Sequence, residues 1–203
     1  MLYHNNVHTE IIFTNEFIMH MCLRVTFFIL FCFGVEGLLL DDGKLEPMKF
    51  SSSAHGPKIE LSDNDTVATR YEGYCWSVCL SDQPLKVGQT LHFNISEIEM
   101  GWMSNLNVGI IYTSPDSLPL GSLVTCDANL SVSIPNTEVF IFQRFYSADN
   151  IYSFTVDDEG IAYLSPNVTS DDIVFTGVDV TKTFWAIFNI FGDSKAVKLL
   201  GLT

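Results

Sequence analysis

The chain has 203 residues, of which 47% are apolar and 13% aromatic, and this is enough to build the core of one ordinary domain without cross-links. Its formal net charge of −14 excludes functions that depend on attracting phosphate backbones, so nucleic acid is not expected as a partner. The sequence has no repeat at a solenoid period, no heptad run and no low-complexity segment, which excludes solenoids and coiled coils.

The first 47 residues differ in character from the rest. We expect a leader over 1–47 and one domain over 48–203, because the polar stretch 41–44 ends just before this boundary. The apolar run at 25–35 has eleven residues, too few to span a bilayer. The chain is therefore not expected to have a stable membrane span in this segment.

The same run also has features of a secretory signal peptide. Arg24 precedes it and Val35-Glu36-Gly37 follows it, which fits a signal peptide over about residues 19–37 that begins at Met19 or Met21. The 20 residues in front do not fit that pattern. A disordered leader or a wrongly assigned start therefore remains the alternative.

From residue 48 onward, short strand patterns alternate with turn residues. Alternating or compact apolar patterns occur at 58–62, 91–95, 108–112, 151–156 and 161–164. Asp157-Asp158-Glu159-Gly160 joins the last two as a hairpin, with Gly160 at the left-handed position. Many short strands and no long amphipathic helix predict an all-β fold, an antiparallel β-sandwich.

The most apolar strand pattern lies at residues 184–191. Phe184, Ala186, Phe188 and Ile190 would point to one face, and Trp185, Ile187 and Phe191 to the other. Both faces are apolar, so we expect a central strand covered on both sides, with Trp185 in the core. The turn residues Gly192-Asp193-Ser194 predict that this strand continues into a hairpin.

A series of short motifs follows a fixed order across about 150 residues. They are His55-Gly56-Pro57-Lys58-Ile59, Ala68-Thr69-Arg70, Ser81-Asp82-Gln83-Pro84-Leu85 with Gly88, Trp102 with Leu106 and Gly109, Ser117-Leu118-Pro119, Ile151-Tyr152-Ser153-Phe154, Val156-Asp157-Asp158-Glu159-Gly160, Phe175-Thr176-Gly177-Val178, and Trp185-Ala186 with Gly192. In this order they resemble the Neuralized homology repeat (NHR) domain of neuralized-like proteins. The resemblance implies a sandwich related to the concanavalin-like and SPRY folds. It also implies a domain that holds a protein partner while a RING or SOCS box recruits the ubiquitination machinery. Notch-pathway proteins are among the ligands of that family.

One stretch departs from the family pattern. The family usually has Trp-x-Gly-x-Leu-Arg-x-Gly, whereas this chain has Trp102-Met103-Ser104-Asn105-Leu106-Asn107-Val108-Gly109, without the Arg and one Gly. We expect the sandwich to survive this change, and a ligand surface built on that Arg to differ.

Catalytic and metal sites find little support in the residues. A RING needs eight Cys or His ligands, and from residue 48 on the chain has only Cys75, Cys79, Cys126, His55 and His92. We expect no catalytic residues, no metal site and no cofactor. His92 alternates with apolar neighbours and is expected on the polar side of its strand, and Asp157, Asp158 and Glu159 are expected to form a solvated turn.

Cys75 and Cys79 are expected to be buried reduced thiols. Cys75 and Cys79 are four residues apart in a strand-like run. At about 3.3 Å per residue they would lie ~13 Å apart, too far for a disulfide with each other.

Four sequons for N-linked glycans begin at Asn64, Asn94, Asn129 and Asn167. About two would be expected by chance, so the excess favours secretion only slightly. Asn94 lies within an alternating strand, where a glycan is tolerated only on an open face.

The connecting loops are the positions free to contact a partner on such a scaffold. We expect an uncharged site of amide and aromatic side chains formed by Arg70, Tyr71, Trp102, Asn105, Asn107 and Tyr112. The alternative for Arg70 is a structural role within the fold.

The sequence therefore predicts a non-enzymatic protein-binding module with a protein or peptide ligand. By resemblance it would lie in the cytoplasm and act as an adaptor for a separate RING or cullin-type ligase, because the chain ends four residues after Leu199 and leaves no room for a SOCS box. The alternative is a secreted β-sandwich that binds an extracellular protein or carbohydrate.

Overall fold

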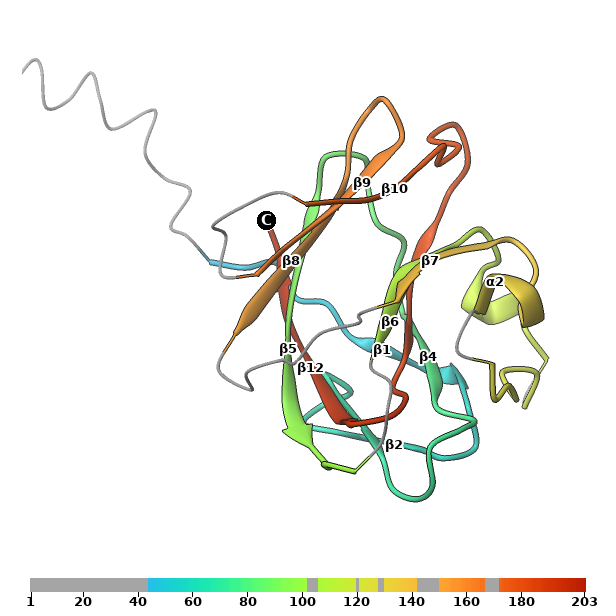
Figure 1. Cartoon of the computed structure of the whole chain (residues 1–203). Coiled ribbons are helices and arrows are strands. Elements are labelled where there is room, and N and C mark those ends of the chain that lie inside the picture. The colour runs from blue at the N-terminus through green and yellow to red at the C-terminus, as the bar shows by residue number, and fades with distance from the viewer. Residues whose placement is uncertain (1–43, 102–105, 120, 128–129, 142–149, 167–171) are drawn as a thin grey trace, which may run out of the picture. The chain divides into compact units, whose positions relative to one another are not determined.

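The domain is a sandwich of two antiparallel sheets. A computed structural model describes residues 44–101, 106–119, 121–127, 130–141, 150–166 and 172–203 (Figure 1). One sheet has five strands in the order β1-β4-β11-β6-β7, and the other has seven in the order β10-β9-β8-β5-β12-β3-β2. The predicted antiparallel β-sandwich is thus confirmed.

The bounds of the described elements follow the chain. They are β1 (Phe50–His55), β2 (Ile59–Ser62), β3 (Val67–Arg70), β4 (Val78–Ser81), β5 (Thr90–Ile98), β6 (Asn107–Ile111), the 3₁₀ helix η1 (Pro115–Ser117), α2 (Leu130–Ser133), β7 (Thr137–Ile141), β8 (Ile151–Val156), β9 (Ile161–Pro166), β10 (Asp172–Thr176), β11 (Trp185–Asn189) and β12 (Ser194–Leu202). Five of these strands fall on the patterns at 58–62, 91–95, 108–112, 151–156 and 161–164.

β11 is the central strand of the five-stranded sheet, as its two apolar faces predict. It pairs with β4 on one side and β6 on the other. Phe184, Ala186, Phe188 and Ile190 belong to the main core between the sheets. The Phe188 ring meets the rings of Phe50 and Phe93 edge-on, at centroid distances of 5.6 and 5.2 Å. Since Phe93 belongs to β5, this contact joins the two sheets.

The other face of the five-stranded sheet has its own cover. Ile187 of β11 packs in a second apolar cluster with Leu123, Leu130 and Ile134, which come from the segment around α2. Figure 1 shows α2 beside β6 and β7 on this side of the sheet. Trp185 also packs against this cluster but is only partly buried. The expectation that Trp185 is a core residue is therefore wrong in degree, and Phe188 is the buried centre of the strand.

The turn after β11 does not form the predicted hairpin. β11 belongs to the five-stranded sheet, whereas β12 pairs with β5 and β3 in the other sheet. Residues 190–193 therefore cross from one layer to the other. Local turn signals at Gly192 could not distinguish a hairpin from this crossing, because both need a sharp change of direction.

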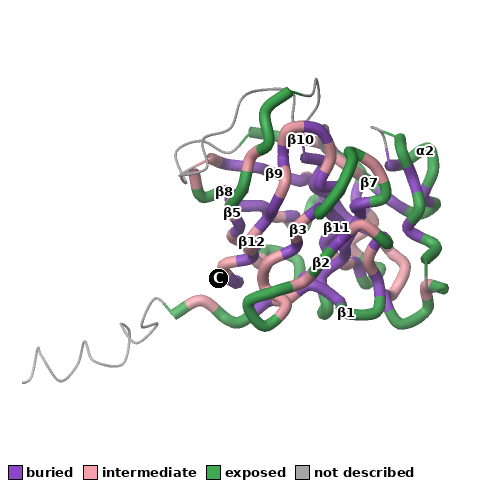
Figure 2. The backbone as a smooth tube through the Cα atoms, turned by 90° about the horizontal axis from the view of Figure 1, so that it is seen from below, coloured by how far each residue is buried: buried purple, intermediate pink, exposed green. Residues whose placement is uncertain are grey.

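The hairpin of β8 and β9 is confirmed, and a carboxylate organises its turn. Asp157 Oδ1 accepts the backbone N–H groups of Glu159 and Ile161, at 3.0 and 2.8 Å. These bonds, led by the one from Ile161, lower the pKa of Asp157. Gly160 has a φ of 76°, the left-handed conformation that glycine adopts without a Cβ clash. Figure 2 shows buried segments along the strands and exposed segments on the connecting loops.

Candidate functional site

The loop from β3 to β4 presents three large aromatic side chains to solvent. We call residues 71–76 the aromatic loop. Tyr71, Tyr74 and Trp76 are 54%, 42% and 44% exposed. Burying aromatic surface is favourable, so exposed aromatics gathered on one short loop mark it as a candidate contact surface.

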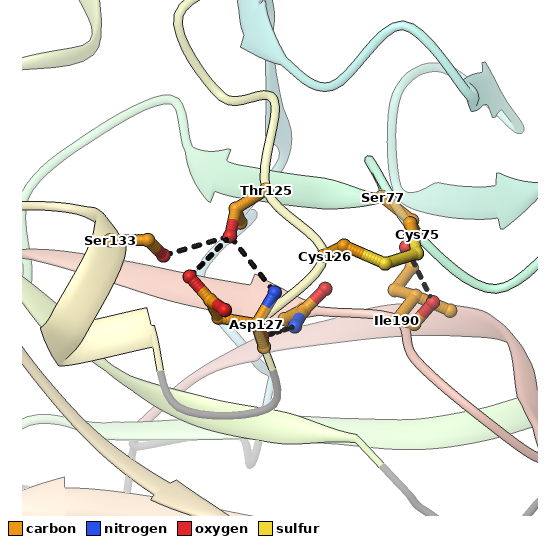
Figure 3. Close-up of a disulfide and its surroundings, with 8 residues drawn as sticks. Cys75, Ser77, Thr125, Cys126, Asp127, Ser133 and Ile190 are labelled. Carbon is orange, nitrogen blue, oxygen red and sulfur yellow. Dashed lines mark hydrogen bonds between the residues drawn. A yellow bond between two sulfur atoms is a disulfide. The ribbon is translucent and has the colours of Figure 1, made fainter.

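A disulfide fixes this loop to a distant part of the chain. Cys75 is bonded to Cys126, 51 residues away in sequence, with Cα atoms 4.6 Å apart (Figure 3). The prediction that Cys75 is a reduced thiol is therefore wrong, because its partner is Cys126 and not its neighbour in sequence. Cys79 is a free, buried thiol as predicted, and burial raises its pKa.

Hydrogen bonds on both sides of Cys75 fix the loop further. The Trp76 backbone N–H donates to the Thr125 carbonyl at 2.9 Å. The Ser77 hydroxyl donates to the Ile190 carbonyl at 2.7 Å, as Figure 3 shows. The backbone around the exposed aromatics is thus held by two separate segments of the domain, which lowers the entropy that they would lose on binding.

The segment just before β2, residues 56–58, also contacts the aromatic loop. The Lys58 ammonium lies 5.1 Å from the centre of the Trp76 ring and 3.3 Å from the Glu72 carboxylate. The Tyr71 hydroxyl donates to the Pro57 carbonyl at 3.0 Å. Gly56 has no room for a side chain, since a Cβ there would collide with the Trp76 carbonyl oxygen. The Lys58 and Glu72 side chains thus form an ion pair at the edge of the aromatic surface.

Arg70, a predicted contact residue, is a structural group. Its side chain is buried, and Nη2 donates to the carbonyls of Gly192 and Ser194 at 2.7 and 3.0 Å. Burial lowers the pKa of Arg70, while Glu99 and Asp193 oppose this shift. The predicted direct contact is corrected in favour of the alternative, because the guanidinium ties β3 to the crossing between β11 and β12.

Asn107 and Tyr112, two other predicted contact residues, do not lie together. Asn107 is buried at the first position of β6, opposite Asn189 of β11. Tyr112 follows the far end of β6, about 16 Å away at 3.3 Å per residue. Its hydroxyl accepts the Asp179 backbone N–H at 2.7 Å, and Lys182 lies 5.3 Å from its ring centre. Trp102 and Asn105 lie outside the described residues.

Of the predicted set, only Tyr71 is described and exposed. The stretch from Arg70 to Tyr74 is one of the loops that the sequence favours for binding, but neither Tyr74 nor Trp76 is among the residues predicted to contact a ligand. The run Tyr71-Glu72-Gly73-Tyr74-Cys75-Trp76 holds three aromatics without a strand-like alternation. That pattern favours a loop that displays aromatic residues. The local sequence does not show that Cys75 pairs with Cys126, and this bond is what fixes the loop.

The remaining polar candidates have structural partners. His92 lies half-buried on the outer face of the seven-stranded sheet, as predicted, within 3.0 Å of the Ser153 and Thr203 hydroxyls. Among the described residues, no group of three or more His, Cys, Asp or Glu is placed to hold a metal ion. No helix in that part of the chain is long and apolar enough to cross a membrane.

Comparisons with known proteins agree with this architecture. The solved structures it resembles are sandwiches. The crystal structure of the Drosophila melanogaster Neuralized NHR1 domain aligns with a TM-score of 0.66 at 22% identity, covering 76% of this chain and 98% of that one. The TRIM65 PSpry domain aligns with a TM-score of 0.52 at 11% identity, covering 75% of this chain and 88% of that one. The fold is thus that of an NHR domain, related to the SPRY sandwiches.

The family model named Neuralized matches residues 50–201, and the chain belongs to this family. It is 24% identical to Protein neuralized of Drosophila melanogaster over 160 residues, covering 77% of this chain and 21% of that protein. It is also 24% identical to the human E3 ubiquitin-protein ligase NEURL3 over 160 residues, covering 78% of this chain and 61% of that protein. The chain therefore spans between a fifth and three fifths of the length of these relatives.

Proposed function

We propose that this domain is a non-catalytic module that binds a protein or peptide ligand through the aromatic loop. The observation that carries the proposal is the exposure of Tyr71, Tyr74 and Trp76 on a loop fixed by the Cys75–Cys126 bond. Tyr and Trp are the residues most enriched where binding energy concentrates, and a fixed backbone lowers the entropy lost on binding. The proposed site keeps Tyr71 from the predicted set and adds Tyr74 and Trp76. Trp102 and Asn105, also from the predicted set, are proposed to contribute to it.

The chemistry of the loop defines the class of ligand. Lys58 and Glu72 form an ion pair beside the loop, and the exposed aromatic faces of Tyr71, Tyr74 and Trp76 supply the proposed contact area. A ligand that fits is an uncharged peptide segment with apolar side chains, since charged groups would lose hydration without a partner. A polyanion does not fit, because the whole chain carries a net charge of −14.

The experiment selects peptides on the full chain from a displayed random library and then measures the affinity of one synthetic selected peptide. We expect Tyr74→Ala and Trp76→Ala each to weaken binding at least tenfold, about 1.4 kcal/mol. Ile173→Ala is the matched control, because Ile173 is 60% exposed on β10, outside the loop. Equal affinity in all the variants would contradict the proposed site.

Two roles for this binding differ in cellular compartment. The name of one relative, the E3 ubiquitin-protein ligase NEURL3, supports a role in ubiquitin ligation. In that role we propose that the domain is an adaptor in the cytoplasm that holds a ligand for a separate RING or cullin-type ligase. The second candidate is a secreted β-sandwich that binds an extracellular protein. The Cys75–Cys126 bond favours this second role, because structural disulfides form and persist in oxidising compartments.

A further inference from the structure

We infer that Asn64 is an N-glycosylation site and that the domain matures in an oxidising secretory compartment. Asn64-Asp65-Thr66 is a sequon, and it forms the turn between β2 and β3. The inference goes beyond ligand binding, since it concerns a covalent modification on another part of the domain.

The turn exposes the Asn64 side chain while other groups fix its backbone. Asp63, Asn64 and Asp65 have φ angles of 50°, 57° and 63°, a left-handed conformation that Asn and Asp tolerate better than most residues. Asn64 is exposed, and its amide makes no hydrogen bond to any residue that the structure describes. The acceptor nitrogen is therefore free to react.

The neighbours of Asn64 hold the turn in place without it. Lys198 Nζ donates to Asp63 Oδ2 at 2.7 Å, and the Thr66 hydroxyl donates to the Asp63 carbonyl at 2.7 Å. The Phe50 backbone N–H donates to the Asp65 carbonyl at 2.8 Å. A glycan on Asn64 would thus replace no contact of the folded domain.

The second described sequon lacks these properties. Asn94 lies inside β5, paired with Ile151 of β8 and Lys198 of β12, and its Oδ1 is buried. A glycan on Asn94 would be attached in the middle of a sheet, on a strand that is hydrogen-bonded to β8 on one side and to β12 on the other. The structure thus distinguishes Asn64 from Asn94, although their sequons are alike in sequence.

The disulfide is an independent observation that points to the same compartment. Cys75 and Cys126 come from segments separated by 51 residues and are bonded in the fold. N-glycan transfer takes place in the compartment in which such bonds form. The apolar run at 25–35 after Arg24 supplies a candidate signal peptide for entry.

The reaction is the transfer of an oligosaccharide from a polyisoprenoid diphosphate donor. The bond between the first sugar carbon and the donor's diphosphate oxygen breaks, and a bond from that carbon to Asn64 Nδ2 forms. The nitrogen loses one proton, and the polyisoprenoid diphosphate leaves. The four residues of β3 lie between this turn and the aromatic loop, so Asn64 is not itself part of the proposed ligand surface.

The test is to express the full chain in cultured animal cells and map its peptides without reduction. Peptide N-glycosidase converts a glycan-bearing Asn into Asp, so the occupancy of each sequon is measured in the wild-type chain. We expect Asn64 to be occupied, Asn94 to be bare and Cys75 to be linked to Cys126. Asn64→Asp should remove one glycan. The control Thr66→Ser keeps both the sequon and the side-chain hydroxyl, so Asn64 should still carry its glycan in that variant.

A bare Asn64 in the purified chain would overturn the inference, whether the two cysteines are linked or free. Occupancy of only the other sequons would overturn it equally. These outcomes leave the proposed function untouched, because peptide binding is measured separately and Asn64→Asp should not change it. Loss of peptide binding in a chain with an occupied Asn64 would instead contradict only the proposed function.

Discussion

The Arg70 guanidinium donates a hydrogen bond of 2.7 Å to the carbonyl of Gly192, at the point where the chain crosses from β11 to β12. A second bond of 3.0 Å to the Ser194 carbonyl makes Arg70 the link between the two layers at this end of the sandwich. Arg70→Met should therefore lower the free energy of unfolding by about 3 kcal/mol, since hydrogen bonds from charged groups are worth about 1.5–3 kcal/mol each. Denaturant titration measures this, and Lys182→Met, at an exposed ion pair, is the control that should change little. Equal stability of Arg70→Met and wild type would remove the structural role of Arg70.

The Cys75–Cys126 bond should contribute strongly to stability. It closes a sequence separation of 51 residues, for which the chain-entropy model gives about 4 kcal/mol. Cys75→Ser with Cys126→Ser should therefore unfold at lower denaturant than the oxidised wild type. Reducing agent should destabilise the wild type and leave the double variant unchanged. If reduction shifts both proteins equally, the effect does not come from this bond.

Phe188 should matter more to stability than Trp185. Phe188 is fully buried and its ring joins the two sheets through Phe93, whereas Trp185 is partly exposed on the outer face. Phe188→Ala should cost about 3–5 kcal/mol, and Trp185→Ala clearly less, because part of its surface stays in water. Thermal melts of the two variants side by side measure the order. The reverse order would show that the outer cluster is the main core.

His92 should make stability depend on pH in the mildly acidic range. Burial lowers the pKa of His92, so the unfolded chain takes up a proton at higher pH than the folded chain does. The neutral His92 therefore contributes its full share of stability at a pH above its pKa in the unfolded chain, about 6.5. This contribution is lost as the pH falls below that value toward the lower pKa of the folded state. Urea midpoints between pH 7.5 and 5.5 should fall more steeply for the wild type than for His92→Gln. Parallel slopes for the two proteins would exclude His92 as the cause.

The sequence predicted the elements better than their connections. The alternation at 184–191 and the turn at Asp157 are local patterns, and both gave the correct strands because burial on a pleated sheet has a period of two. The crossing after β11 could not be predicted, since Gly192 serves a hairpin and a change of sheet equally well. The same limit applies to the site: the burial of Arg70 and the pairing of Cys75 with Cys126 depend on segments 122 and 51 residues apart in sequence.

The central claim is that a peptide ligand contacts the aromatic loop. Hydroxyl-radical footprinting of the full chain, with and without the selected synthetic peptide, measures this directly at each exposed side chain. We predict that bound peptide protects Tyr71, Tyr74 and Trp76 from oxidation and leaves the exposed Val132 and Ile173 unchanged. If the peptide instead protects Tyr112 and Lys182 and leaves the aromatic loop as reactive as before, the claim that the ligand contacts this loop is contradicted.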